Sequence, residues 1–145
     1  MKNWLLAVIC RAAQRAAQLD AADEGRLWLR PLWDRLAELP REDRDRVSLA
    51  LIDARSGIGA DWLPRLESAA QSFGHESAVV AAVGMVFAER QLWGKARRLL
   101  EQAAAAPSLH PHTRRQAWRQ LAQLARQQSD EARAVLCERA AAAID

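Results

Sequence analysis

The chain has 145 residues, enough for one domain with a substantial core. Half of the residues are hydrophobic, chiefly alanine and leucine, and only six are glycine, so the composition favours helix throughout. The formal net charge of +3 is too small to indicate a nucleic-acid-binding protein. No run alternates as a β-strand would, and no apolar stretch is long enough to cross a membrane. We predict an all-α protein with no membrane segment and no nucleic-acid partner.

Hydrophobic periodicity and helix breakers predict eight helices. In chain order they cover residues 3–19, 26–38, 42–54, 61–73, 76–90, 92 or 93 to 106, 111 or 112 to 127, and 129 or 130 to the C-terminus. Pro40 and Pro107 end the second and sixth helices, polar residues Asp20–Gly25 separate the first two, and Ser56-Gly57-Ile58-Gly59 predicts a turn. Short links then make four antiparallel pairs, at about 3–38, 42–73, 76–106 and 111–143, in a single domain spanning 1–145.

Residues suited to capping stand at several predicted helix starts. Asp61 is a candidate N-cap, with Pro64 in the first turn of the same helix. Ser77 can cap the fifth helix, and Ser129 or Asp130 can cap the eighth.

Shifting the sequence by 34 residues superimposes small residues on small ones and leucine on leucine. Ala16, Ala50 and Gly84 fall in one register. Further matches are Leu32, Leu66 and Leu100, and Ala54, Ala88 and Ala122. Paired helices with this period indicate a tetratricopeptide-like array, an α-α superhelix of the kind that usually binds other proteins.

The unit from residue 77 to 110 has the clearest tetratricopeptide spacing. Gly84, Phe87, Ala96, Leu100 and Pro107 supply its small, aromatic, small, large and proline positions. Closely crossing helices need a residue without bulk, so we expect Gly84 to face Ala96, with Phe87 and Leu100 filling the sides. The predicted repeat-packing residues are Ala50, Leu66, Gly84, Phe87, Ala96, Leu100, Leu121 and Ala122.

Two units depart from this pattern. Asp53 stands where an aromatic residue is expected, and Trp62 stands where a small residue is expected. In the last unit, residues 131–136 match residues 95–100 only after a two-residue slip, which we interpret as a shorter turn between the last two helices.

Several strings resemble the HemY proteins of proteobacteria. Leu92-Trp-Gly-Lys-Ala-Arg, Leu100-Glu-Gln-Ala-Ala and Arg114-Arg-Gln-Ala-Trp-Arg-Gln-Leu-Ala are similar to the C-terminal part of that family. Trp33-Asp-Arg-Leu-Ala-Glu-Leu-Pro resembles the stretch that precedes the family's repeats. The resemblance covers the chain from about Trp28 onward, and Leu92-Trp-Gly-Lys-Ala-Arg is its most specific string.

The resemblance implies a role in haem (protoporphyrin) biosynthesis. HemY proteins carry a membrane hairpin ahead of their repeats, so this chain would be the soluble C-terminal region, on the cytoplasmic face of the bacterial inner membrane. It would scaffold or regulate membrane-associated enzymes of that pathway. The family gives no catalytic residues to transfer, and no strand leads into a GxGxxG turn. We therefore expect a non-catalytic protein-binding module without a cofactor.

In tetratricopeptide arrays the first helix of each pair lines the groove. The register places basic and apolar residues there, which would suit an acidic, partly apolar peptide because arginine grips a carboxylate with two parallel hydrogen bonds. The predicted groove residues are Arg44, Val47, Leu51, Arg55, Ala81, Met85, Glu89, Arg115 and Arg119, with His112 at the edge.

Other conspicuous residues carry weaker signals. Trp28 and Trp33 are five apart and cannot point the same way on a helix, so one of them should be exposed. His110-Pro-His112 does not have a known metal-ligand spacing, and we expect no metal. Cys10 and Cys137 lie among apolar neighbours and should be buried free thiols.

Three alternative functions stay open. A porphyrin- or haem-binding protein would use His110, His112 or a tryptophan. A homo-oligomeric scaffold would bury its groove or its exposed tryptophans against a second copy. A general helical-repeat adaptor would act outside haem metabolism.

Overall fold

The computed structural model describes residues 3–144, and within that range it contains eight α-helices, two short 3₁₀ helices and no strand. The α-helices are α1 (Asn3–Gln18), α2 (Ala22–Trp33), α3 (Arg41–Asp53), α4 (Leu63–Ser72), α5 (Ser77–Glu89), α6 (Trp93–Ala104), α7 (Pro111–Gln127) and α8 (Glu131–Ala142). The 3₁₀ helices are η1 (Leu36–Glu38) and η2 (Ala60–Trp62). The predicted all-α class is confirmed. None of the described helices is both long and apolar enough to cross a bilayer.

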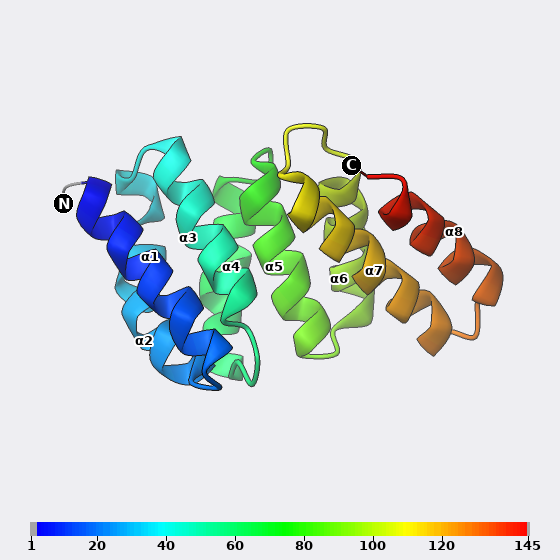
Figure 1. The fold of residues 1–145 in the computed structure, drawn as a ribbon, viewed down its shortest axis with the longest axis horizontal. Helices are drawn as coiled ribbons and strands as arrows, with labels where there is room; N and C mark the ends of the chain where they lie inside the picture. Colours follow the sequence, from blue (N-terminus) through cyan, green and yellow to red (C-terminus); the bar gives the residue numbers. More distant parts are fainter. Residues whose placement is uncertain (1–2, 145) are drawn as a thin grey trace.

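The helices form two layers that run along the length of the molecule (Figure 1). α1, α3, α5 and α7 lie side by side in one layer, each in contact with the next, and α2, α4 and α6 lie behind them. α1 packs on α2, α5 on α6 and α7 on α8. The first helix pair is therefore at one end of the molecule and the last pair is at the other.

Three of the four helix pairs turn in the same way. Asp20, Gln91 and Ser129 follow α1, α5 and α7 with φ of 61°, 62° and 59°, in the left-handed region. In each turn the N–H of the next residue donates to the carbonyl five residues earlier, at 2.8 Å. This is a Schellman motif, which more often has glycine at the left-handed position. The same helical hairpin therefore occurs three times, each time without glycine at the left-handed position.

The predicted shortening of the last turn is wrong. Three residues link α5 to α6 (90–92), and three link α7 to α8 (128–130). The last pair differs instead in the length of its first helix, since α7 has 17 residues whereas α5 has 13.

The second pair is built differently. A long link with Gly57 at φ 73° and the 3₁₀ helix η2 connects α3 to α4. Trp62 is buried there, and its ring lies edge-to-face on Trp33 of α2, with centroids 6.5 Å apart. The Trp33 Nε1–H donates to the Arg65 carbonyl at 3.3 Å. This large residue fills the space beside α2, and α3 and α4 approach each other less closely than the helices of the other pairs.

Some predicted helix starts need correction. α2 begins at Ala22 and not near residue 26, so Asp23 and Glu24 lie in its first turn, where acidic groups favour a helix. Gly25, expected in the loop, is helical and packs on α1, where a Cβ would come within 2.8 Å of the Ala13 carbonyl. Asp130 caps α8 as predicted, accepting from the Arg133 N–H at 3.1 Å.

Two further cap predictions are wrong. Trp62 holds the N-cap position of α4 and Glu76 that of α5, neither with a side-chain capping bond. Asp61 therefore does not cap α4. Ser77 is the first residue of α5, and its hydroxyl lies 3.2 Å from that of Ser108.

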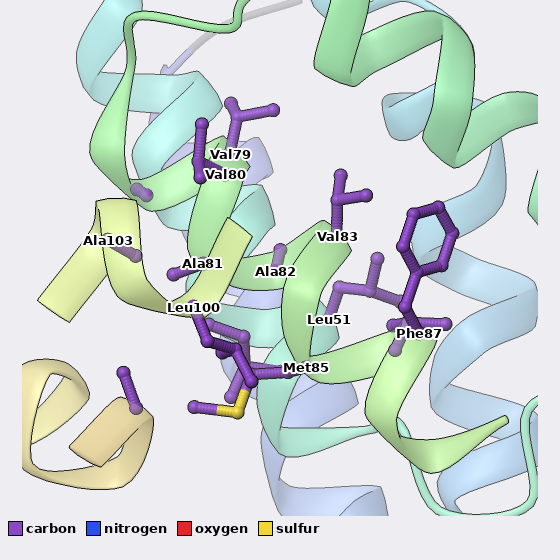
Figure 2. Close-up of a cluster of buried hydrophobic side chains, with 14 of the residues drawn as sticks. Leu51, Val79, Val80, Ala81, Ala82, Val83, Met85, Phe87, Leu100 and Ala103 are labelled. Atoms are coloured by element: carbon purple, nitrogen blue, oxygen red, sulfur yellow. The ribbon is translucent and has the colours of Figure 1, made fainter. Parts of the chain in front are cut away.

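The core is centred on α5, whose residues from 78 to 88 are all buried. In Figure 2, Val83 and Phe87 point to one side of this helix, while Ala81 points toward Leu100 and Ala103 of α6. All of the predicted repeat-packing residues are buried: Ala50, Leu66, Gly84, Phe87, Ala96, Leu100, Leu121 and Ala122. The atoms nearest to Gly84, however, belong to Leu99 and Leu100 rather than to Ala96. A Cβ on Gly84 would lie 3.1 Å from Leu100 Cγ and 3.2 Å from Leu99 Cβ.

Enlarging Gly84 should destabilise the protein. Gly84→Val would push against Leu99 and Leu100, and we expect it to lower the free energy of unfolding by about 1–3 kcal/mol. The matched control is Gly94→Ala in α6, where an added Cβ meets nothing within 4 Å and helix propensity should raise stability by up to about 1 kcal/mol. Urea denaturation measures both. Equal stability of wild type and Gly84→Val would contradict the close crossing of α5 and α6.

The Cys10 thiol should react slowly while the protein is folded. Its side chain is buried, and this burial raises the pKa of the thiol to about 11, because the thiolate would lose its hydration. In a Cys137→Ala background, labelling with a chromogenic disulfide at pH 8 should be at least about 100-fold slower for native protein than in guanidinium, since only the thiolate attacks. Similar rates in the two conditions would mean that Cys10 is accessible.

Candidate functional site

The candidate site is a groove across the layer of α1, α3 and α7, here called the inner groove. It consists of two hollows, of about 690 Å³ and about 140 Å³, that share Gln14 and Asp53. Gln14 Nε2 donates to Asp53 Oδ2 at 2.8 Å, which joins α1 to α3 in the middle of the groove. The lining residues are Val8, Arg11, Ala12, Gln14, Arg15 and Gln18 of α1, Leu49, Ile52 and Asp53 of α3, and His110, His112, Thr113 and Gln116 at the start of α7.

The two ends of the inner groove differ in charge. Arg11 and Arg15 are exposed on the α1 side. Half-buried Leu49 and buried Ile52 supply apolar surface on α3, and His112 and Gln116 supply polar surface on α7. A segment with an acidic end and an apolar side chain would find complementary groups along this surface.

The α3 residues of the predicted groove lie on other faces of that helix. Val47 and Leu51 are fully buried, with 0% exposure. Leu49 lies two positions from each, and two positions turn a helix by about 200°. The apolar residues of the prediction therefore pack into the core, and the accessible face of α3 is the one that carries Leu49.

Arg44 is bound inside the fold and does not line the inner groove. Its guanidinium grips the Glu76 carboxylate through Nε–Oε1 at 3.0 Å and Nη2–Oε2 at 2.8 Å, while Nη1 donates to the Leu39 carbonyl at 2.6 Å. The same group lies 4.8 Å from the centroid of the Phe73 ring. The Glu76 side chain is 3% exposed. This ion pair ties α3 to the start of α5.

The other predicted groove residues are distributed over several faces. Ala81 and Met85 are fully buried in the core. The structure does bring Arg55 and Glu89 together, with Nε and Oε1 3.9 Å apart, and Arg55 also donates to the Ile52 carbonyl at 2.7 Å. Neither of these two residues lines the hollows.

The α7 arginines also lie outside the inner groove. Arg115 and Arg119 are one helical turn apart on one face of α7, whereas Thr113 and Gln116 line the groove. Arg119 is exposed, and Arg115 is half-buried with an Nε that finds no hydrogen-bond partner.

The two histidines at the start of α7 are arranged as a helix cap. The His110 Nδ1 accepts from the His112 N–H at 3.2 Å, so that nitrogen is engaged locally. His112 lines the inner groove, at whose edge the sequence placed it. Within residues 3–144, no three His, Cys, Asp or Glu side chains gather as a metal site requires.

Sequence reasoning missed most of the inner groove. Arg11, Gln14 and Arg15 lie in the first helix, for which no groove residue was predicted, and Leu49 was assigned to no face of its helix. A local signal was present in α3. Val47, Leu51 and Ala54 follow the spacing of a buried helical stripe, which leaves Leu49 on another face.

Comparisons with known proteins find no matching family model, no similar curated protein and no similar solved structure. The resemblance to HemY therefore depends on the sequence strings alone.

Removing the Arg44 side chain should lower the free energy of unfolding. Arg44→Ala leaves the buried Glu76 carboxylate without its partner, which we expect to cost about 3–5 kcal/mol of unfolding free energy. Arg119→Ala is the control, because this exposed side chain should change stability by less than about 0.5 kcal/mol. Guanidinium denaturation followed by circular dichroism measures both. Equal stability of the two variants would show that the ion pair is dispensable.

Proposed function

We propose that this chain is a tetratricopeptide-like array that acts as a non-catalytic protein-interaction module. It would hold a segment of a partner protein in the inner groove. The observation that carries the proposal is the groove itself, which gathers accessible side chains from α1, α3 and α7, helices far apart in the sequence.

Features of the architecture support the repeat assignment. The sequence matches itself at a shift of 34 residues. The first helices of successive pairs stack in order, and three pairs share one turn geometry. In arrays of this kind each unit contacts its neighbours and the stack presents an extended binding surface.

The chemistry of the groove favours an acidic, partly apolar segment. Arg11 and Arg15 are exposed, and each guanidinium can bind a carboxylate through two parallel hydrogen bonds. Val8 offers apolar contact in the same hollow as the arginines, and Leu49 offers it in the adjoining hollow. The acidic ligand is the one first inferred from the sequence, but Arg11 and Arg15 now replace Arg44 and Arg55 as the groups that would bind it.

The resemblance to HemY gives this proposal a biological setting. On that basis the partner would be an enzyme of haem (protoporphyrin) biosynthesis at the cytoplasmic face of the bacterial inner membrane. The module would scaffold or regulate that enzyme.

A charge-reversing groove variant tests the proposal. Arg11→Glu/Leu49→Glu places two carboxylates in the groove, whereas the control Arg98→Glu/Leu136→Glu makes the same chemical changes at exposed positions outside it. Affinity capture from a proteobacterial lysate, followed by titration of the captured enzyme, should show at least about tenfold weaker binding for the groove variant, or about 1.4 kcal/mol. The control should bind as wild type does.

Two results would overturn the proposal. Equal affinity of the groove variant and wild type would place the contact elsewhere. A Soret shift on titration with haem, in the absence of any captured protein, would favour the porphyrin-binding alternative.

A further inference from the structure

A separate hollow lies among the helices of the second layer, between α4 and the segment that runs from the end of α2 through η1. Its volume is about 600 Å³, and it shares no residue with the inner groove. We call it the outer cleft. Its lining residues are Trp33, Asp34, Leu36 and Ala37 on one wall, and Pro64, Arg65, Ser68, Ala69, Ser72 and Phe73 on the other.

Contacts close the outer cleft at both ends. At the start of α4, Arg65 Nε donates to Asp34 Oδ1 at 2.8 Å. At the other end, the Arg44 guanidinium donates to the Leu39 carbonyl, just after η1, and lies over the ring of Phe73, just after α4. Residues 65 and 73 are separated by about 12 Å along a helix, so an extended peptide of more than about four residues would meet the closed ends. The outer cleft therefore suits a compact molecule.

The neighbouring helix pair shows why the outer cleft is open. At the shift of 34 residues, Ser68 of α4 corresponds to Gln102 of α6. Gln102 reaches back to the preceding pair, where its Nε2 donates to the Gly74 carbonyl at 2.7 Å. The side chain of Ser68 is too short to make such a bridge. Space that a glutamine spans between the second and third pairs is therefore left free between the first and second.

The outer cleft carries no net charge. Of the described residues that line it, only Asp34 and Arg65 are charged, and they bind each other. A charged ligand would lose its hydration in the cleft without gaining a free counter-charge, which is costly. An uncharged molecule is therefore favoured.

Apolar side chains form the floor of the outer cleft. Leu36, Ala69 and Trp33 are buried there, and half-buried Phe73 lies at the far end. The sequence predicted that one of Trp28 and Trp33 would be exposed, and this is confirmed, with 44% exposure for Trp28 and 3% for Trp33. An aromatic ring on this floor would bury apolar area beside two aromatic side chains, in contacts that ring systems favour.

Hydroxyl groups stand on the α4 wall above this floor. Ser68 and Ser72 are exposed and lie one helical turn apart on the face of α4 that lines the cleft. Each hydroxyl can donate and accept hydrogen bonds. The combination of an apolar floor with a few polar groups, in a volume between roughly 300 and 1,000 Å³, is typical of sites for small molecules.

We propose that the outer cleft binds a small uncharged aromatic molecule that carries a hydroxyl or N–H group. Its ring system would lie on Leu36, Ala69 and Trp33, and its polar edge would face Ser68 and Ser72. The site is independent of the inner groove, so the chain would hold a small molecule on one layer and a protein segment on the other.

Two fluorescent probes with the same rings test the proposal. Phenylnaphthylamine is uncharged and has one N–H group, and anilinonaphthalene sulfonate adds only a sulfonate. The uncharged probe should bind the 145-residue chain saturably at one site. The sulfonate probe should bind at least about tenfold more weakly, because the cleft offers its charge no partner. Fluorescence titration measures both affinities. Absence of saturable binding by the uncharged probe, or equal affinity for both probes, would overturn the proposal.

Matched substitutions on α4 locate the bound probe. Ser68→Trp should weaken binding of phenylnaphthylamine at least about tenfold, because the indole occupies its space. Gln71→Trp is the control, since Gln71 is exposed on α4 outside the cleft, and it should bind as wild type does. Ser68→Gln introduces the bridging residue of the third pair and should also weaken binding. Circular dichroism verifies that all three variants stay helical. Wild-type affinity in both Ser68 variants would contradict the assigned site.

Substitutions at other apolar surfaces separate this site from them. Trp28→Glu alters an exposed side chain of α2, Leu49→Glu alters the inner groove, and both should leave probe binding unchanged. Loss of binding in either variant, with full binding by Ser68→Trp, would place the probe outside the cleft and overturn the proposal. Ser68→Trp should still bind the protein partner of the inner groove, so the two proposals can fail separately.

Discussion

The structure depends on the burial of α5 on every side. Its residues from Ala78 to Ala88 are alanine, valine, glycine, methionine and phenylalanine, and their generally small size lets α3, α6 and α7 approach together. Gly84 marks the closest of these approaches, against Leu99 and Leu100. At the start of the same helix, Glu76 binds Arg44 of α3 and fixes how the second and third pairs meet. The smaller hollow of the inner groove lies between α3 and α7, both of which pack on α5.

The all-α class and most helix positions could be predicted, because they follow from local periodicity and from breakers such as Pro40 and Pro107. The turns could not. Asp20, Gln91 and Ser129 adopt the left-handed conformation because the carbonyls at the helix ends need donors, and none of the three is the glycine that usually signals such a turn. The start of α2 was misplaced for a related reason, since Gly25 was read as a loop residue whereas its small size serves a helix crossing.

The candidate site was harder to predict than the fold. Arg44 was predicted to bind a partner because it is basic and falls at a groove position of the repeat register. In the structure it binds Glu76, which lies 32 residues away, and no local sequence pattern reveals that pairing. The prediction that Val47 and Leu51 line the groove was wrong for a different reason. A repeat register transferred from an idealised array can be wrong by two positions, and two positions carry a side chain from the groove to the core. Conversely, Leu49 and Arg11 become recognisable only once the faces of α1 and α3 are known.

The wide spacing of α3 and α4 makes the second pair the most compliant joint of the molecule. The other three pairs are closed by three-residue hairpins, whereas this pair has a long link, and α4 is held by α5, by the Trp62–Trp33 contact and by the ion pairs Arg65–Asp34 and Lys95–Glu67. Segments with fewer packed neighbours open locally at a lower free energy than the core. Local opening is therefore expected to begin at this pair, with α4 separating from α3 while α3 and α5 stay packed and joined by the Arg44–Glu76 ion pair.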